Sequence, residues 1–257
     1  MTGRSGVDAV AVAAAGAAAP LLSVERLCAW YGRAQILFDV DLSVRPGEVV
    51  ALMGRNGAGK STTMKAIMGL MARVAGRVRF DGRDLAGMDP HRINRLGIGW
   101  VPEDRRIFTD LTVLENLEVG RRPPRADAPA WTVERLFALF PNLAAMPDRP
   151  GGRMSGGEQQ MLTVARTLMG NPRLVLLDEP SEGVAPLIVE QMARTIVELK
   201  SQGLSVLLSE QNLAFAAAVA DRACVLEKGQ VRFTGSMHDL LADTQVRDAF
   251  LGVPGGA

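Results

Sequence analysis

The sequence predicts an α/β protein with a mainly parallel core sheet, helices on both faces, an N-terminal antiparallel β subdomain and a helical insertion. Two observations support this fold class. Short apolar runs of strand length alternate with segments whose apolar residues recur at helical spacing, as in parallel sheets. A chain of 257 residues, 47% of them hydrophobic, can also bury one large core of this kind.

The N-terminal end is expected to contain a tail and then a small sheet. Residues 1 to 20 are rich in alanine and glycine, which bury too little surface to offset the entropy of ordering them. We expect a disordered tail there and one domain over residues 21 to 257. Pro20 and the weak apolarity also make the tail a poor membrane span or signal peptide. From Leu21 to Val44, short strand patterns interrupted at Tyr31-Gly32 indicate an antiparallel sheet.

The first part of the core is a buried strand followed by a helix. The apolar run from Val49 to Met53 leads into a glycine-rich loop, and the next helix carries apolar residues at i, i+3, i+4 and i+7. We interpret those residues as core packing, namely Met64, Ile67, Met68 and Met71. A strand at Arg77 to Phe80 then ends in the Asp81-Gly82 turn.

The rest of the chain alternates helices and strands after an insertion. Helical periodicity mixed with several prolines indicates a helical insertion at about residues 104 to 168. A helix from about Glu158 to Gly170 is expected to close it. The elements expected beyond it are a strand at Leu174 to Leu177, a helix from Ile188 ending at Gly203, a strand at Leu204 to Leu208 and a hairpin from Val225 to Phe233.

Composition excludes some classes of function. Lys and Arg number 29 against 28 Asp and Glu, so binding of nucleic acid through bulk charge is not expected. Cys28 and Cys224 are the only cysteines, far apart and without metal-ligand spacing. They are expected to be free thiols in a reducing compartment.

A phosphate-binding loop follows the first buried strand. Residues 54 to 61, GRNGAGKS, match GxxxxGK[ST], and they lie between a strand and a helix as that motif requires. The glycines let backbone N–H groups surround phosphate oxygens at the positive end of the helix. Lys60 can reach the β- and γ-phosphates, and the Ser61 hydroxyl can bind Mg²⁺. The predicted ATP-binding residues of this loop are Gly54, Arg55, Asn56, Gly57, Ala58, Gly59, Lys60, Ser61 and Thr62.

Two carboxylates follow the strand at Leu174 to Leu177, at the sheet edge where ligands of open α/β sheets bind. Asp178 is expected to hold Mg²⁺ through its water shell. Glu179 is expected to orient the water that attacks the γ-phosphate, or to take its proton. Together with a phosphate loop, this pair favours nucleotide hydrolysis.

A second anion-binding helix start is indicated at Ser155, Gly156 and Gly157, which open the helix that begins near Glu158. Backbone N–H groups and one hydroxyl at a helix start can bind phosphate. Taken alone, however, this segment is more often a simple N-cap followed by flexible glycines.

These three motifs, in this order and spacing, resemble the ATP-binding-cassette (ABC) family over about Leu21 to Leu251, which implies a P-loop NTPase fold of ABC type. The resemblance implies that the signature residues Ser155, Gly156, Gly157 and Glu158 act in trans on ATP held by a partner subunit. It also implies that Tyr31, the only tyrosine, stacks on adenine.

A narrower resemblance concerns one of the two ATPase subunits of branched-chain amino acid importers. It rests on residues 102 to 108 (PEDRRIF), 111 to 117 (LTVLENL), 179 to 186 (EPSEGVAP) and 209 to 212 (SEQN). Importers for urea, amides and other amino acids share much of this pattern. The segment from Glu103 to Asn116 precedes the insertion as the family's coupling segment does, so it is expected to contact a membrane partner.

Three residues depart from the common ABC pattern. Glu103 replaces the usual glutamine beside Mg²⁺ and the attacking water; it can still bind the metal but adds negative charge. Gln211 replaces the switch histidine; its amide can bind phosphate but cannot carry a proton. Ala185 replaces an aspartate that usually crosses the dimer interface. The catalytic residues predicted are therefore Glu179 and Gln211, and the Mg²⁺ ligands are Ser61, Asp178 and Glu103.

The sequence therefore predicts an ATPase that uses ATP and Mg²⁺ to drive an ABC importer for branched-chain or related amino acids. We expect it at the cytoplasmic face of the membrane, bound to transmembrane permeases and a different ATPase subunit, with a homodimer as the alternative. A periplasmic solute-binding protein would act with it indirectly, and no nucleic acid is expected. The competing hypotheses are a urea or amide importer, a soluble ABC ATPase, a non-hydrolysing nucleotide switch and a small-molecule kinase.

Overall fold

The core of the protein is a six-stranded sheet. The structure is a computed structural model that describes residues 19–252. The strand order is β10-β9-β3-β8-β7-β6; β9, β3, β8, β7 and β6 are parallel, and β10 is antiparallel to β9. The strands are β3 (Val49–Met53), β6 (Ile98–Val101), β7 (Leu174–Asp178), β8 (Ser205–Glu210), β9 (Arg222–Glu227) and β10 (Gln230–Ser236). The predicted parallel core is confirmed.

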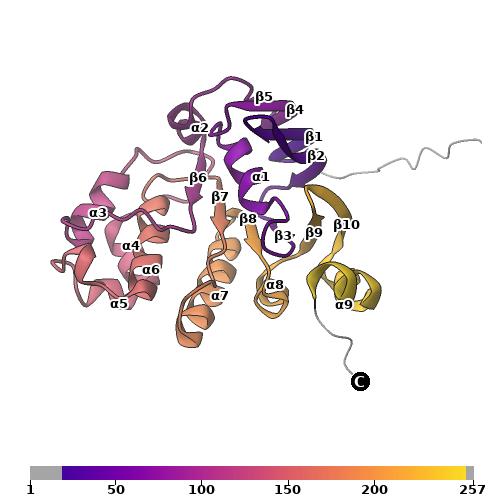
Figure 1. Cartoon of the computed structure of the whole chain (residues 1–257). Helices are drawn as coiled ribbons and strands as arrows, with labels where there is room; N and C mark the ends of the chain where they lie inside the picture. The colour runs from indigo at the N-terminus through magenta and orange to yellow at the C-terminus, as the bar shows by residue number, and fades with distance from the viewer. Residues whose placement is uncertain (1–18, 253–257) are drawn as a thin grey trace, which may run out of the picture.

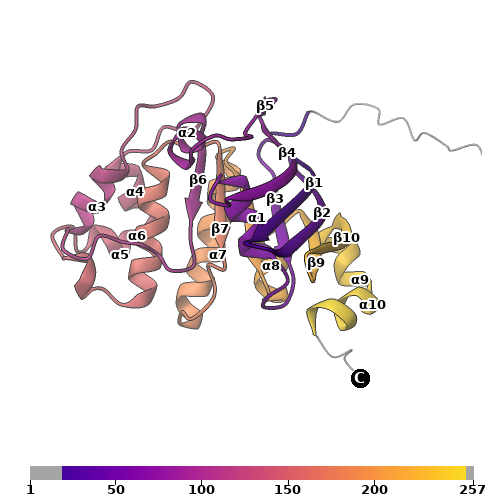
Figure 2. The ribbon, with the colours of Figure 1, turned by 45° about the horizontal axis from the view of Figure 1, so that its top comes forward.

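A second, antiparallel sheet of order β2-β1-β4-β5 lies beside the core sheet (Figures 1 and 2). It contains β1 (Leu22–Tyr31), β2 (Ala34–Val44), β4 (Arg73–Phe80) and β5 (Arg83–Asp84). Strands β1 and β2 turn at Gly32, whose φ of +58° suits glycine. This is the antiparallel subdomain that the sequence predicts, and it places Tyr31 next to the turn.

Helices cover both faces of the core sheet because its buried strands point alternate side chains to opposite sides. Val50 and Leu52 pack with the antiparallel sheet and with α1 (Lys60–Ile67). Val49 points the other way, into a cluster with α6 (Gly156–Leu168), α7 (Pro186–Ser201) and α8 (Leu213–Val219). The sheet is therefore the middle layer of the fold.

A helical region lies between β6 and β7, to the left in Figure 1. Besides α6 it holds α3 (Val113–Gly120), α4 (Val133–Leu139), α5 (Pro141–Ala144) and the 3-10 turn Gly151–Arg153. Buried Asn116 fixes the segment before α3, since its amide donates to the carbonyl oxygens of Phe108, Leu111 and Thr112. Leu117 and Leu136 join this region to the core on the α6 side.

Several elements differ from the sequence-based expectation. Helix α1 ends at Ile67, so Met68 and Met71 are buried as expected but lie beyond the helix. The sequence did not predict α2 (Pro90–Leu96) or the C-terminal helices α9 (Met237–Ala242), α10 (Thr244–Val246) and the π-helical turn Arg247–Leu251. A capping box between Ser236 and Asp239 was the available signal for α9.

Most of the N-terminal tail predicted at residues 1 to 20 lies outside the described residues, so this prediction stays untested. No helix within residues 19–252 combines the length and the apolar character needed to cross a membrane.

The burial of Leu176 in β7 gives a stability prediction. Leu176 is 0% exposed and packs between the core sheet and the antiparallel sheet, whereas Leu187 on α7 is 73% exposed. Leu176→Ala should lower the free energy of unfolding by about 2–5 kcal/mol, because it removes buried methyl groups and leaves a cavity. Leu187→Ala is the matched control and should change it by less than about 0.5 kcal/mol. Urea unfolding of both variants measures the difference, and equal losses would contradict this description of the core.

Candidate nucleotide-binding site

The loop between β3 and α1 has the conformation of a phosphate-binding loop. Gly54, Gly57 and Gly59 all have positive φ, at +153°, +81° and +111°. A Cβ on Gly54 would lie 2.5 Å from the carbonyl oxygen of Leu226 in β9, so the loop passes this strand at a distance that only glycine allows. Gly59 caps α1, and no side chain caps the helix start. The N–H groups at the start of α1 are therefore available to an anion.

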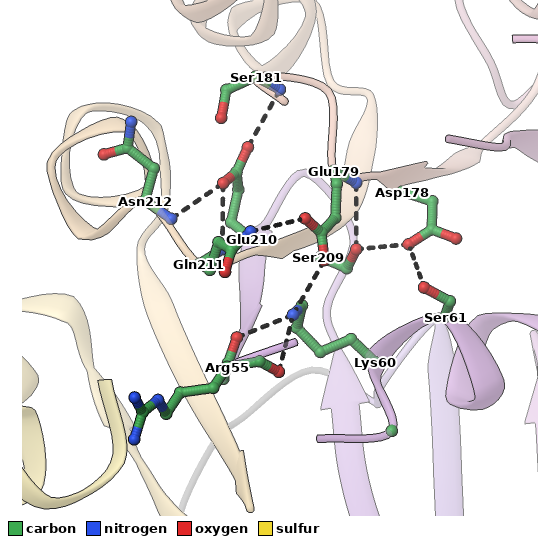
Figure 3. Close-up of polar contacts among 12 residues, drawn as sticks. Arg55, Lys60, Ser61, Asp178, Glu179, Ser181, Ser209, Glu210, Gln211 and Asn212 are labelled. Atoms are coloured by element: carbon green, nitrogen blue, oxygen red, sulfur yellow. Dashed lines mark hydrogen bonds and ion pairs between the residues drawn. The ribbon is translucent and has the colours of Figure 1, made fainter. Parts of the chain in front are cut away.

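Lys60 connects this loop to the end of β7 (Figure 3). Its ammonium Nζ donates to the carbonyl oxygen of Gly54 at 2.8 Å and pairs with Glu179 Oε1 at 2.9 Å. Lys60 is 3% exposed and Glu179 is 7% exposed. A buried charge is tolerated only with partners of this kind. Lys60 can bind a γ-phosphate by exchanging Glu179 for phosphate oxygens.

Asp178, at the end of β7, receives hydroxyl donors from two neighbouring elements. Ser61 Oγ of α1 donates to Asp178 Oδ1 at 3.0 Å, and Ser209 Oγ of β8 donates to the same oxygen at 2.6 Å. Burial raises the pKa of Asp178 above its usual value, and the two hydroxyl donors offset part of this effect. The structure thus brings two of the three predicted Mg²⁺ ligands, Ser61 and Asp178, into direct contact.

Glu179 has a strained backbone and a well-connected side chain. Its φ is +48°, a left-handed conformation that is uncommon for residues other than glycine. Its Oε2 accepts from Gln211 Nε2 at 3.3 Å, so the two predicted catalytic residues are in contact. Burial acts to raise the pKa of Glu179, but hydrogen bonds from Glu182, Lys60 and Gln211 lower it overall. Glu179 is thus held as a carboxylate.

Of these groups, Lys60, Ser61 and Glu179 line a pocket of about 440 Å³. Tyr31, 49% exposed, lines the side formed by the antiparallel sheet, and Glu103 lines the pocket as well. From the loop, the lining residues are Asn56, Gly57, Gly59, Lys60, Ser61 and Thr62. Asp178 lines a second pocket, which Ser61 and Glu103 also line. The side chain of Arg55 points away from the Lys60 cluster (Figure 3) and lines a separate pocket with Phe250. Gly54 and Ala58 do not line the 440 Å³ pocket. Gly54 lies against the backbone of Leu226, and Ala58 lines the pocket of Arg55 together with Leu226.

The signature residues form a separate helix start that does not line this pocket. Ser155 Oγ accepts from the N–H of Glu158 at 3.3 Å, and Glu158 Oε2 accepts from the N–H of Ser155 at 2.7 Å, which makes a capping box. The Ser155 O–H remains a donor, together with the N–H groups of Gly156 and Gly157. Within one chain, the two predicted phosphate-binding helix starts are therefore apart.

The structure adds residues that the sequence reasoning did not assign. Glu182 lines the pocket, and its hydrogen bond to Glu179 raises the pKa of Glu182 to about 7, with burial and the charges of Glu179 and Glu103 adding to the effect. Ser209 and Glu210 end β8 beside Asp178 and Glu179. Their place after a buried strand was the signal available, since the carboxyl ends of parallel strands share one edge.

Comparison with known proteins places this site in a family. The family model described as ABC transporter matches residues 37–182. The chain is 43% identical, over 90% of its length and 100% of the relative's, to the high-affinity branched-chain amino acid transport ATP-binding protein BraG of Pseudomonas aeruginosa. It is 34% identical, over 90% of its length and 97% of the relative's, to the lipopolysaccharide export system ATP-binding protein LptB of Haemophilus influenzae.

A solved structure gives the same result for the fold. The chain matches the ADP conformation of an ATP-binding cassette of an ABC transporter with a TM-score of 0.76 and 28% identity, covering 93% of this chain and 100% of the other. The fold and site thus define a nucleotide-binding ATPase. The chain belongs to the ABC transporter family, as one of its ATP-hydrolysing subunits, which work with transmembrane permease components.

The close approach of Gly54 to β9 gives a prediction for nucleotide binding. Gly54→Ala places a methyl group against the Leu226 carbonyl oxygen, so the loop must move. We expect the Kd for ATP to rise at least ~10-fold, about 1.4 kcal/mol. Gly82→Ala is the matched control, because Gly82 also has positive φ, +74°, but nothing lies within 4 Å of its added Cβ. Fluorescent-nucleotide titration should show a change of less than ~2-fold for Gly82→Ala, and equal changes in both variants would refute the argument.

Proposed function

We propose that this chain hydrolyses ATP to power an importer of branched-chain or related amino acids. The observation that carries the proposal is that Lys60, Ser61 and Glu179 line one pocket, with Asp178 bound to Ser61 and Gln211 bound to Glu179. The amino acid specificity is supported by the 43% identity to BraG.

Each residue has a role in the proposed reaction. Lys60 and the N–H groups at the start of α1 bind and orient the β- and γ-phosphates, and Tyr31 stacks on the adenine. Glu179 accepts a hydrogen bond or a proton from the attacking water, consistent with its lowered pKa. The amide of Gln211 donates to Glu179 and fixes that carboxylate, and the same NH₂ group can donate to the γ-phosphate.

The residues present fit a magnesium ion. Ser61 and Asp178 offer hard oxygen donors 3.0 Å apart, and Glu103 lines a pocket together with both of them. Mg²⁺ keeps several of its waters and usually shares its ligands with substrate phosphates, so few protein oxygens are needed to hold it. When bound, Mg²⁺ neutralises negative charge that develops on the phosphate oxygens.

The signature residues support a dimer. Ser155, Gly156 and Gly157 lie apart from the pocket of their own chain, so they can complete the ATP site of a partner placed head to tail. Gln211 cannot carry a proton as a histidine would. We therefore expect the natural partner to be a second, different ATPase subunit, giving two unequal sites.

The missing histidine leads to a kinetic prediction. The purified chain should hydrolyse ATP slowly as a homodimer, and Gln211→His should raise its turnover, because imidazolium can stabilise the charge on the γ-phosphate. Glu179→Gln is the control and should lower turnover by ~10²-fold or more, as expected for loss of a general base. Steady-state phosphate release measures all three proteins. Turnover of the unaltered homodimer at the rate of the assembled transporter would exclude the need for a different partner.

The transported solute has two other candidates. One is urea, because urea importers share much of the sequence pattern, and the other is a lipopolysaccharide, because the relative LptB acts in lipopolysaccharide export.

Disruption of the gene should abolish high-affinity uptake of labelled leucine, and a gene copy that encodes Lys60→Ala should fail to restore uptake. Unchanged leucine uptake together with loss of urea uptake would favour the urea importer. Loss of neither would exclude both importers and leave the exporter.

We propose that the protein binds peripherally to the cytoplasmic face of the membrane through its coupling segment. Phe108 is 47% exposed and lies in a groove of about 280 Å³ that also contains Arg106, Val119 and Arg166. Exposed apolar surface bordered by polar residues is typical of a protein-binding site.

The position of Phe108 in this groove gives a crosslinking prediction. A photoreactive amino acid at Phe108 should crosslink to a cytoplasmic loop of the permease in membranes. The same probe at Leu241, which is 39% exposed and lies on α9, is the control and should crosslink far less. Absence of any Phe108 crosslink while ATP-dependent dimerisation is intact would contradict the assignment.

A further inference from the structure

Glu210, the last residue of β8, is a buried carboxylate to which neither the fold nor the proposed reaction gives a role. It is 1% exposed, and no ion pair among the residues 19–252 includes it. Burial raises the pKa of Glu210, and hydrogen bonds from the Ser181 side chain and from backbone N–H groups offset part of the effect. A carboxyl group buried without a cation is costly unless it has specific hydrogen-bond partners.

The two oxygens of Glu210 bind two different loops (Figure 3). Oε1 accepts from the N–H of Ser181, in the loop that follows Glu179, at 3.1 Å. Oε2 accepts from the N–H groups of Gln211 and Asn212, in the loop that follows β8, each at 3.1 Å. One side chain therefore fixes three backbone donors.

Both loops carry groups of the ATP site. The first begins at Glu179, and the second contains Gln211, whose amide donates to Glu179 at 3.3 Å. Asn212 also caps α8 by accepting from the N–H of Phe215 at 3.1 Å. In the sheet, Glu210 pairs with Met53, the residue before the phosphate loop. The carboxylate thus lies where the loops around the site meet.

We propose that Glu210 is a positioning residue for ATP hydrolysis, which clamps the loop after Glu179 to the loop carrying Gln211 so that these two side chains stay in contact. The inference rests on the proposed function for its effect on hydrolysis. Only a carboxylate presents two acceptor oxygens without a donor; an amide would present an NH₂ group to one of the loops. The residue acts through Gln211 and Glu179 and does not touch the nucleotide.

Glu210→Gln tests the clamp in the full-length chain. We expect kcat for ATP hydrolysis to fall at least ~10-fold, because misplaced catalytic groups lose transition-state stabilisation. KM and the Kd for ADP should change less than ~2-fold, since the phosphate loop keeps its contacts. Glu48→Gln is the control. Glu48 is 8% exposed, accepts from the N–H of Arg45 at 2.8 Å and pairs with Arg222 at 3.3 Å, but it precedes β3 at the end far from the site. It should leave kcat unchanged.

A double-mutant cycle separates positioning from general destabilisation. In a Gln211→Ala background, Glu210→Gln should lower kcat by a much smaller factor than in the unaltered chain, because its effect passes through Gln211. An undiminished loss of kcat in that background would overturn the proposal, as would an unchanged kcat of Glu210→Gln alone.

Amide hydrogen exchange tests the clamp without relying on turnover. Glu210→Gln should speed exchange in both loops, residues 179–185 and 210–213, while Glu48→Gln should speed it in neither. Faster exchange in one loop only, or in none, would refute the clamp even if ATP hydrolysis proceeds as proposed. Failure of the chain to hydrolyse ATP at all, with faster exchange in both loops, would refute the proposed function and leave the clamp standing.

Discussion

The parallel register of β3, β7 and β8 is the constraint on which the site depends. Leu52 of β3 pairs with Ser209, and Asp178 of β7 pairs with the same residue from the other side. The three strands therefore end at one level, and the loop after each begins at the same edge. A shift of one residue in any strand would turn its side chains to the opposite face and break the Asp178 contacts. The buried Val, Leu and Ile side chains of the core hold this register.

Charge at this edge is balanced within a small volume. Lys60 is paired with Glu179, while Asp178 is stabilised by two hydroxyl donors and Glu210 by three backbone N–H groups. The three buried carboxylates are therefore stabilised by three different kinds of partner. Of these three carboxylates, only Glu179 is paired with a cation, and a phosphate could displace it from Lys60. The contacts of Glu179 therefore depend on whether a nucleotide is bound.

Much of the fold and site could be predicted from the sequence. Residues 54 to 61 and the pair Asp178-Glu179 are short, local patterns beside buried strands, and the structure brings Lys60, Ser61, Asp178, Glu179 and Gln211 together. Glu210 could not be assigned a role, because its partner Ser181 lies in a loop that meets it only after the sheet has formed. Glu182 lies three residues after Glu179, but no motif used in the sequence analysis linked the two carboxyl groups. Helices α9 and α10 are short and have weak periodicity, so packing against the sheet decides their positions.

The left-handed backbone of Glu179 has a consequence for how the protein can change. In that conformation a side chain with a Cβ costs about 1–2 kcal/mol relative to glycine, so the end of β7 carries local backbone strain. Glycine at this position would relieve the strain but would leave the ammonium of Lys60 buried without its carboxylate partner. The ion pair therefore offsets the strained backbone, and the conformation of this loop depends on Lys60 as well as on Glu179.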